Sequence, residues 1–194
     1  IHPDGKRVLF ASTHTDPKSK ELQAAEYKER AESKVRRYSW DYDENYEIWE
    51  YSLADKSLKN LTNTRGYDAE GAYSPDGRKI VFCSLRDAYP PEKLPAEDRK
   101  RLETDPSYFG EIYLMNADGS ELVNLTQNEA LDDAPSWSPD GQFLAFSTDR
   151  DGNREIYRMR ADGSGALRLT FDLAFDIMSA YSPDGATIAF ASNR

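Results

Sequence analysis

Residues 138–160 read SPDGQFLAFSTDRDGNREIYRMR, and this stretch decides the fold. It contains a Pro-Asp-Gly turn, an apolar run that ends in Phe146, and then Glu155-Ile156-Tyr157. Pro presets φ at the first position of a tight turn and Gly tolerates positive φ, so the pattern predicts a turn followed by a short strand. The same turn and apolar run occur four times, with the turns beginning at Pro3, Pro75, Pro139 and Pro183.

Two further anchors recur with the turns. One is a Glu-Ile-aromatic triplet that begins at Glu47, Glu111 and Glu155, and the other is a Leu-Thr pair that begins at Leu61, Leu125 and Leu169. From Glu to Leu is 14 residues in all three copies, and from that Leu to the residue before Pro-Asp-Gly is 13. The interval from the residue before Pro-Asp-Gly to the next Glu varies, at 45, 37 and 17 residues. The shortest repeat is therefore 44 residues long.

Each repeat predicts four short strands. Ala-Asp-Gly-Ser at 117–120 and 161–164 marks a second hairpin turn, and the runs between turns are rich in Ile, Val, Phe and Tyr. A period of about 40–45 residues with four strands per unit is typical of a β-propeller blade. The predicted fold class is therefore all-β, with blade repeats at 1–67, 68–131, 132–175 and 176–194, or about three blades in all.

Together, Ser-Pro-Asp-Gly, Glu-Ile-Tyr, Ala-Asp-Gly-Ser and Leu-Thr resemble the WD-like propeller repeats of the TolB-like family. The resemblance implies a six-bladed ring, a bacterial periplasm or cell envelope, and protein partners. We therefore expect the chain, which opens with Ile1, to be a fragment whose remaining blades and signal peptide belong to the same longer chain. The alternative for an arc of this size is that two copies complete the ring.

Composition excludes several classes of protein. The 194 residues carry 25 basic and 35 acidic side chains, so the formal net charge is −10, and the isoelectric point is about 4.8. Nucleic-acid binding, which needs clustered Lys and Arg, is not expected. A membrane span is not expected either, since no run of about 18 apolar residues occurs. Cys83, the single cysteine, should be a buried strand residue.

The extra residues of the longer repeats form two insertions, at 13–46 and 87–110, which both fall between the second and third strands of their blades. They should therefore decorate one mouth of the propeller as neighbours. Asp16 and Pro17 predict the start of a helix that extends to Arg37, and a shorter charged helix is predicted from Pro95 to about Glu103.

Aromatic side chains follow both predicted helices. Clustered Tyr, Trp and Arg are typical of protein-binding surfaces, but the same rings would also hold an insertion against its blade, and the sequence leaves both interpretations open. The candidate binding residues of this kind are Arg36, Arg37, Tyr38, Trp40, Asp41, Tyr42, Asp43, Tyr108 and Phe109.

Asp68, Asp132 and Asp176 each stand six residues before a Ser-Pro-Asp-Gly turn, on the loops nearest the channel. As a ring they would bind a cation or a basic segment, whereas as loop caps they would be structural, and a feature repeated in every blade favours structure. Arginines recur eleven residues after the proline of each later turn, at Arg86, Arg150 and Arg194, where pairing with a carboxylate is expected.

In the first blade His14 occupies the arginine position, which makes it a candidate binding residue. No catalytic residue, metal site or cofactor is predicted, because the chain carries no nucleophile elbow, phosphate loop or zinc-type spacing. The function expected from the sequence is a non-catalytic protein-binding module of a TolB-like envelope protein. The alternative is a propeller that gates substrates for a peptidase or other hydrolase whose catalytic domain lies outside residues 1–194. A weaker third hypothesis is catalysis at the mouth through His14.

Overall fold

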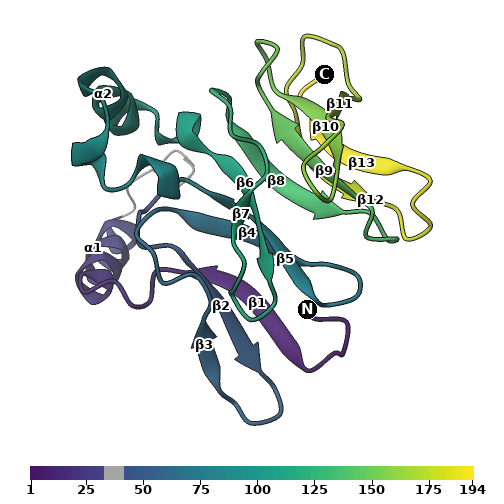
Figure 1. The fold of residues 1–194 in the computed structure, drawn as a ribbon. Helices are drawn as coiled ribbons and strands as arrows, with labels where there is room; N and C mark the ends of the chain where they lie inside the picture. The colour runs from purple at the N-terminus through teal and green to yellow at the C-terminus, as the bar shows by residue number, and fades with distance from the viewer. Residues whose placement is uncertain (33–41) are drawn as a thin grey trace.

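The computed structural model of the chain describes residues 1–32 and 42–194. It contains four antiparallel sheets that follow one another along the chain (Figure 1). The innermost strands of the sheets contact one another, which is the radial arrangement of propeller blades.

The sheets are named first to fourth in chain order. The first sheet contains β1 (Arg7–Ser12), β2 (Glu47–Ser52) and β3 (Leu58–Asn60). The second contains β4 (Asp68–Tyr73), β5 (Lys79–Ser84), β6 (Glu111–Asn116) and β7 (Val123–Asn124). The third contains β8 (Asp132–Trp137), β9 (Phe143–Thr148), β10 (Glu155–Arg160) and β11 (Leu167–Arg168). The fourth contains β12 (Asp176–Tyr181) and β13 (Ile188–Ser192).

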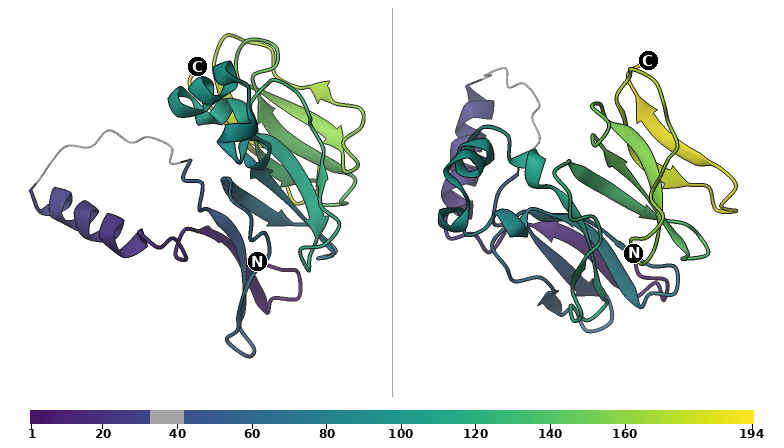
Figure 2. Two further views of the ribbon diagram at one scale, coloured as in Figure 1. Left: turned by 60° about the vertical axis from the view of Figure 1, so that its left-hand side comes forward. Right: turned by 45° about the horizontal axis from the view of Figure 1, so that its top comes forward.

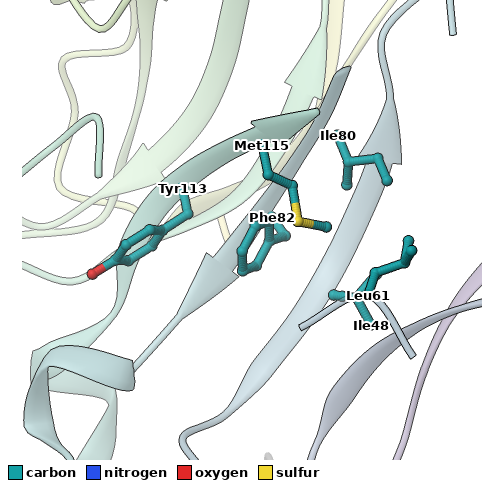
Figure 3. Packing of buried hydrophobic residues seen from close by; sticks show 6 residues of the cluster. All are labelled: Ile48, Leu61, Ile80, Phe82, Tyr113 and Met115. Carbon is teal, nitrogen blue, oxygen red and sulfur yellow. The ribbon is translucent and has the colours of Figure 1, made fainter. Parts of the chain in front are cut away.

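The hydrophobic core lies between the sheets. Figure 3 shows the cluster between the first and second sheets, to which β5 contributes Ile80 and Phe82. Val81, the residue between them, points to the other face of β5 and joins the cluster shared with the third sheet. Both faces of this strand are therefore buried, which explains why its sequence is a continuous apolar run. Each fully buried side chain of this size stabilises the fold by about 1.5–3 kcal/mol.

The innermost strands β4, β8 and β12 share one irregularity. Each pairs with its neighbour through a register shift, and the bulged residue has positive φ in all three: Glu70 (60°), Ala134 (50°) and Met178 (56°). A bulge bends the strand and re-aims the side chains around it, so these positions are placed by the repeat itself.

Both insertions lie at the same end of the sheets (Figure 1). The first contains α1 (Ser19–Ala31), which starts two residues after the predicted position because Asp16 Oδ1 accepts a bond from the Lys18 backbone N–H in a turn before the helix. No residue of α1 is buried, and Figure 2 shows the helix extending away from the sheets.

The second insertion is more tightly folded. It contains 3-10 helices η1 (Arg86–Ala88), η2 (Pro91–Lys93) and η3 (Pro106–Phe109) around α2 (Ala96–Thr104). The prediction of a helix from Pro95 to Glu103 is confirmed to within one residue at each end. Leu102 anchors α2, since it is the helix's buried side chain. Within the described residues, no helix is long and apolar enough to cross a membrane.

Candidate functional site

The end of the sheets that carries both insertions is called the insertion face. An aromatic cluster joins the two insertions to the second sheet there. Tyr42 and Tyr46 come from the first insertion, with ring centroids 5.1 and 5.6 Å from that of Tyr67. Tyr89 and Phe109 come from the second insertion and pack against the same group of buried residues, which comprises Tyr67, Ala69, Cys83 and Leu85. The insertions are therefore neighbours held on one platform, and Cys83 is buried as predicted.

This cluster separates the aromatic candidates into two groups. Tyr42 and Phe109 pack inward, so their contacts hold the insertions in place. Tyr108 lies at the outer edge, where its ring meets Phe109 edge-on at 5.1 Å and the Arg101 guanidinium lies 3.9 Å from its centroid. The candidates Arg36, Arg37, Tyr38, Trp40 and Asp41 lie outside the described residues.

A shallow cleft runs beside Tyr108, with a volume of about 230 Å³. Acidic side chains dominate its lining, which includes Asp87, Asp98, Glu111 and Glu129. Burial raises the pKa of Glu111 to about 7. Hydrogen bonds from the Thr126 hydroxyl and the Asn128 backbone N–H favour the charged form, but their effect on the pKa is smaller than that of burial. The cleft thus combines an aromatic wall with negative charge, which suits a Lys or Arg side chain.

His14 and Asp43 line a second, larger hollow of about 730 Å³ beneath α1. His14 Nδ1 lies 3.0 Å from Ser12 Oγ, and its ring centroid is 4.3 Å from that of Trp49. Asp43 accepts hydrogen bonds from the backbone and side chain of Asn45. His14 contacts the same repeat positions as the arginines of the later blades, because Arg86 bonds Ser84 and lies over Tyr113.

The three repeated aspartates do not form a ring of free carboxylates. Asp68, Asp132 and Asp176 are completely buried, and each forms an ion pair with the recurring arginine of its own blade. The N–O distances are 2.7 Å for Arg86–Asp68, 2.9 Å for Arg150–Asp132 and 2.7 Å for Arg194–Asp176. Burying a carboxylate without a partner costs free energy, so each of these aspartates is paired with an arginine inside its own blade. This favours the interpretation of the aspartates as structural residues over that of a ligand-binding ring. The sequence predicts a carboxylate partner for each arginine, and the structure identifies that partner as the aspartate of the same blade.

Sequence reasoning missed a polar cluster around the bulge of β4. Glu70 accepts a hydrogen bond from the backbone N–H of Ala134, and Asp133 forms an ion pair with Arg154. Burial, and after it the charge of Asp133, raises the pKa of Glu70 to about 7. Burial and then the charge of Asp133 also raise the pKa of Tyr42 in the first insertion. One signal was available, because Asp133 stands where the other repeats have the apolar residues Ala69 and Ile177.

Within the described residues, no group of three or more His, Cys, Asp or Glu side chains is arranged to hold a metal ion.

Comparison with known proteins agrees with this architecture. Residues 100–194 match the family model of the TolB beta propeller domain. The chain is 31% identical over 129 residues to a TolB homologue from Chlorobium luteolum, and 34% identical over 80 residues to the Tol-Pal system protein TolB of Alcanivorax borkumensis. These matches cover 55% and 41% of this chain but only 30% and 14% of the two relatives.

The structure is also similar to that of TolB from Acinetobacter baumannii. The TM-score is 0.62 at 20% identity, over 97% of this chain and 35% of that one, which shows a shared fold. These relatives are TolB proteins, so the peptidase-type alternative is not favoured. The fold is therefore that of a partial β-propeller of the TolB type, and residues 100–194, just under half of the chain, match the TolB β-propeller domain family.

Proposed function

We propose that this chain is a non-catalytic protein-binding module of a TolB-like envelope protein in the bacterial periplasm, and that it binds its partner through the insertion face. The observation that carries the proposal is the aromatic cluster that holds both insertions on the second sheet. A surface already held in place loses little conformational freedom on binding, which favours affinity.

The chemistry of the insertion face supports a partner segment that carries positive charge. Tyr108 and Arg101 form a stacked pair at its edge, and aromatic and arginine side chains dominate binding energy in many interfaces. The adjacent cleft carries Asp87, Asp98 and Glu129. Complementary charge across an interface speeds association and excludes wrong partners.

The kinship with Tol-Pal system proteins supplies a specific partner to test. Binding of the intact protein to purified Pal from the same organism would be measured by isothermal titration calorimetry. We expect Tyr108→Ala to weaken binding at least about tenfold, in the range of a typical interface hot spot. Arg78→Ala, at an 85% exposed side chain on the opposite end of the sheets, is the control and should bind like the wild type.

Two outcomes would contradict different parts of the proposal. Absence of binding to Pal by the intact protein would exclude the Tol-Pal role. Tight binding that Tyr108→Ala and Asp98→Asn leave unchanged would keep Pal as a partner but exclude this face as its binding surface.

A further inference from the structure

The end of the sheets opposite the insertions carries the Pro-Asp-Gly turns and is called the turn face (Figure 1). Adjacent sheets meet there at three junctions formed by equivalent repeat positions. Lys79 lies at the junction of the second and third sheets. The same repeat position is Arg7 at the junction of the first and second sheets and Phe143 at the junction of the third and fourth sheets. In the same way Leu114 corresponds to Glu50 and Arg158. The junctions can therefore be compared position by position.

The junction of the first and second sheets is filled. His2 is buried there, with Nε2 3.1 Å from the carbonyl oxygen of Gly77 and its ring edge-on to Tyr73. A Cβ atom added at Gly77 would lie 2.2 Å from His2 Nε2, so nothing further fits. Arg7 and Glu50 close the junction with an ion pair of 3.2 Å.

The junction of the third and fourth sheets keeps a smaller hollow of about 420 Å³, whose lining contains Arg158 together with the exposed Asp140 and Asp184. The Arg158 guanidinium lies 4.4 Å from the ring centroid of Phe143, and both side chains line the hollow. Arg158 therefore places a charged side chain over the aromatic wall, at the repeat position where the second sheet has Leu114.

The junction of the second and third sheets is both larger and apolar. Its hollow of about 610 Å³, called the middle groove, is within the range of about 300–1,000 Å³ typical of ligand sites. Pro75, Leu114 and Trp137 form its walls, and a Cβ added at Gly141 would meet no atom closer than 3.6 Å. Trp137 Nε1 donates a 3.2 Å hydrogen bond to the carbonyl oxygen of Ala72, which fixes the orientation of the partly buried indole ring.

The rim of the middle groove is negatively charged. Asp76, Asp140 and Asp162 are exposed, and each accepts a 2.6 Å hydrogen bond from a serine two residues away. These bonds hold the pKa of all three carboxyls below its usual value, so all three are charged at neutral pH. Lys79 is the only cationic residue among the described residues of the lining, and Asn116 and Glu121 already engage its ammonium group, at 2.7 and 3.6 Å.

We propose that the middle groove is a second protein-docking site, which takes an apolar side chain flanked by Lys or Arg from an exposed loop of a partner protein. The apolar side chain would contact Trp137 and Leu114, and the cation would pair with the rim aspartates. Fixed aromatic rings in partly desolvated pockets are typical of interface hot spots. The site lies at the other end of the sheets from the insertion face, so it is independent of the function proposed above.

The next junction supplies the variant that tests the proposal. Lys79→Phe combined with Leu114→Arg places a Phe–Arg pair like Phe143–Arg158 in the middle groove. The third sheet already has Phe and Arg at these two repeat positions, so the repeat tolerates them. A phage-displayed library of random 12-residue peptides would be selected on the chain and counter-selected on this double variant. We expect the enriched peptides to pair Leu, Met, Phe or Trp with a neighbouring Lys or Arg. Synthetic versions should bind the double variant at least about tenfold more weakly and change the fluorescence of Trp137.

Further variants separate the docking site from a general effect on folding. Asp140→Asn with Asp162→Asn removes only rim charge, and it should weaken binding severalfold and reduce its dependence on salt. Phe143→Lys with Arg158→Leu should open a second groove and raise the number of peptides bound per chain. Any one of three results would overturn the proposal. The first is that no peptide is specific to the wild type, and the second is that the enriched peptides lack basic residues. The third is that peptide binding is lost in Tyr108→Ala and retained in the groove variants.

Discussion

Asp132 and Arg150 illustrate how a single repeated pair supports each blade. The carboxylate is completely buried on β8, while the arginine side chain reaches it from the loop after β9 and lies over Phe146 and Tyr157. The arginine thus covers the aromatic core and neutralises a charge that the strand has removed from water. Breaking such a pair from one side leaves the remaining charge without its partner.

Arg150→Ala is therefore expected to lower the free energy of unfolding by about 2 kcal/mol, somewhat less than for a wholly buried pair because the arginine is 25% exposed. Replacing both partners, with Asp132→Asn and Arg150→Met, should cost less than Arg150→Ala alone because no charge remains buried. Urea unfolding would measure both values, with Arg78→Ala as an exposed control that changes stability by less than about 0.5 kcal/mol. A double variant less stable than the single one would contradict this account.

Glu70 makes the stability depend on pH. Its carboxyl has a pKa of about 7 in the fold and an ordinary value of 4.5, so between these values the native state binds more protons than the unfolded state. The free energy of unfolding should then fall as the pH rises from about 4.5 to about 7. Asp68, with a pKa raised by burial to about 6, contributes in the same direction.

Glu70→Gln keeps an oxygen for the backbone N–H of Ala134 but cannot ionise. We expect its stability relative to the wild type to increase between pH 5 and pH 8 by on the order of 1 kcal/mol. Urea unfolding at the two pH values would measure the difference, and the Asp68 contribution cancels because both proteins retain it. Parallel pH profiles for the two proteins would show that Glu70 does not titrate in this range.

At the scale of elements, the two insertion helices differ in how firmly they are attached. Leu102 of α2 is buried, whereas Leu22 of α1 is 51% exposed. Leu102→Ala should therefore destabilise the second insertion by about 2 kcal/mol, while Leu22→Ala should change stability by less than about 0.5 kcal/mol. Hydrogen exchange would locate the effect: faster exchange in residues 96–104 is expected for Leu102→Ala, with the strands of the second sheet unchanged. Equal effects of the two substitutions would show that α1 is packed as firmly as α2.

The elements were predictable to different degrees, for physical reasons. The strands and turns followed from spacing alone, because every blade repeats the same turn chemistry and the same buried positions. The start of α1 was predicted too early because Asp16 caps a turn and not the helix. A carboxylate partner for Arg150 was predicted, but its identity as Asp132 was not, because the two residues lie 18 positions apart and are joined only by folding. The Glu70 cluster depends on contacts between different blades, for which the repeat carries only the weak signal of Asp133.

At the scale of the whole molecule, equivalent residues of different sheets differ in how deeply they are buried, and therefore in how much they stabilise the fold. Phe146 and Phe190 occupy the same place in their repeats, after the Pro-Asp-Gly turn and before the recurring arginine. Phe146 lies between the second and third sheets and is completely buried, while Phe190, in the fourth sheet, is 36% exposed within residues 1–194. Phe190 shares the face of β13 with Ile188, which pairs with Tyr181 at the junction with the third sheet, so its neighbouring sheet is already present. Phe146 is also covered by the outer strands of its own blade, where the Tyr157 ring centroid lies 6.1 Å from its own, and the fourth sheet contains only β12 and β13 within residues 1–194.

This difference predicts unequal costs for one substitution. In residues 1–194, Phe146→Ala should lower the free energy of unfolding by about 3–5 kcal/mol, and Phe190→Ala by about 1 kcal/mol, because the exposed ring loses less buried surface and leaves a smaller cavity. Thermal and urea unfolding would measure both. If further strands complete the fourth sheet beside β13 in the intact protein, Phe190→Ala should become as costly there as Phe146→Ala, whereas an unchanged cost of about 1 kcal/mol would show that no such strand covers Phe190. Equal costs within residues 1–194 would contradict the view that the outer strands of a blade complete the core around this phenylalanine.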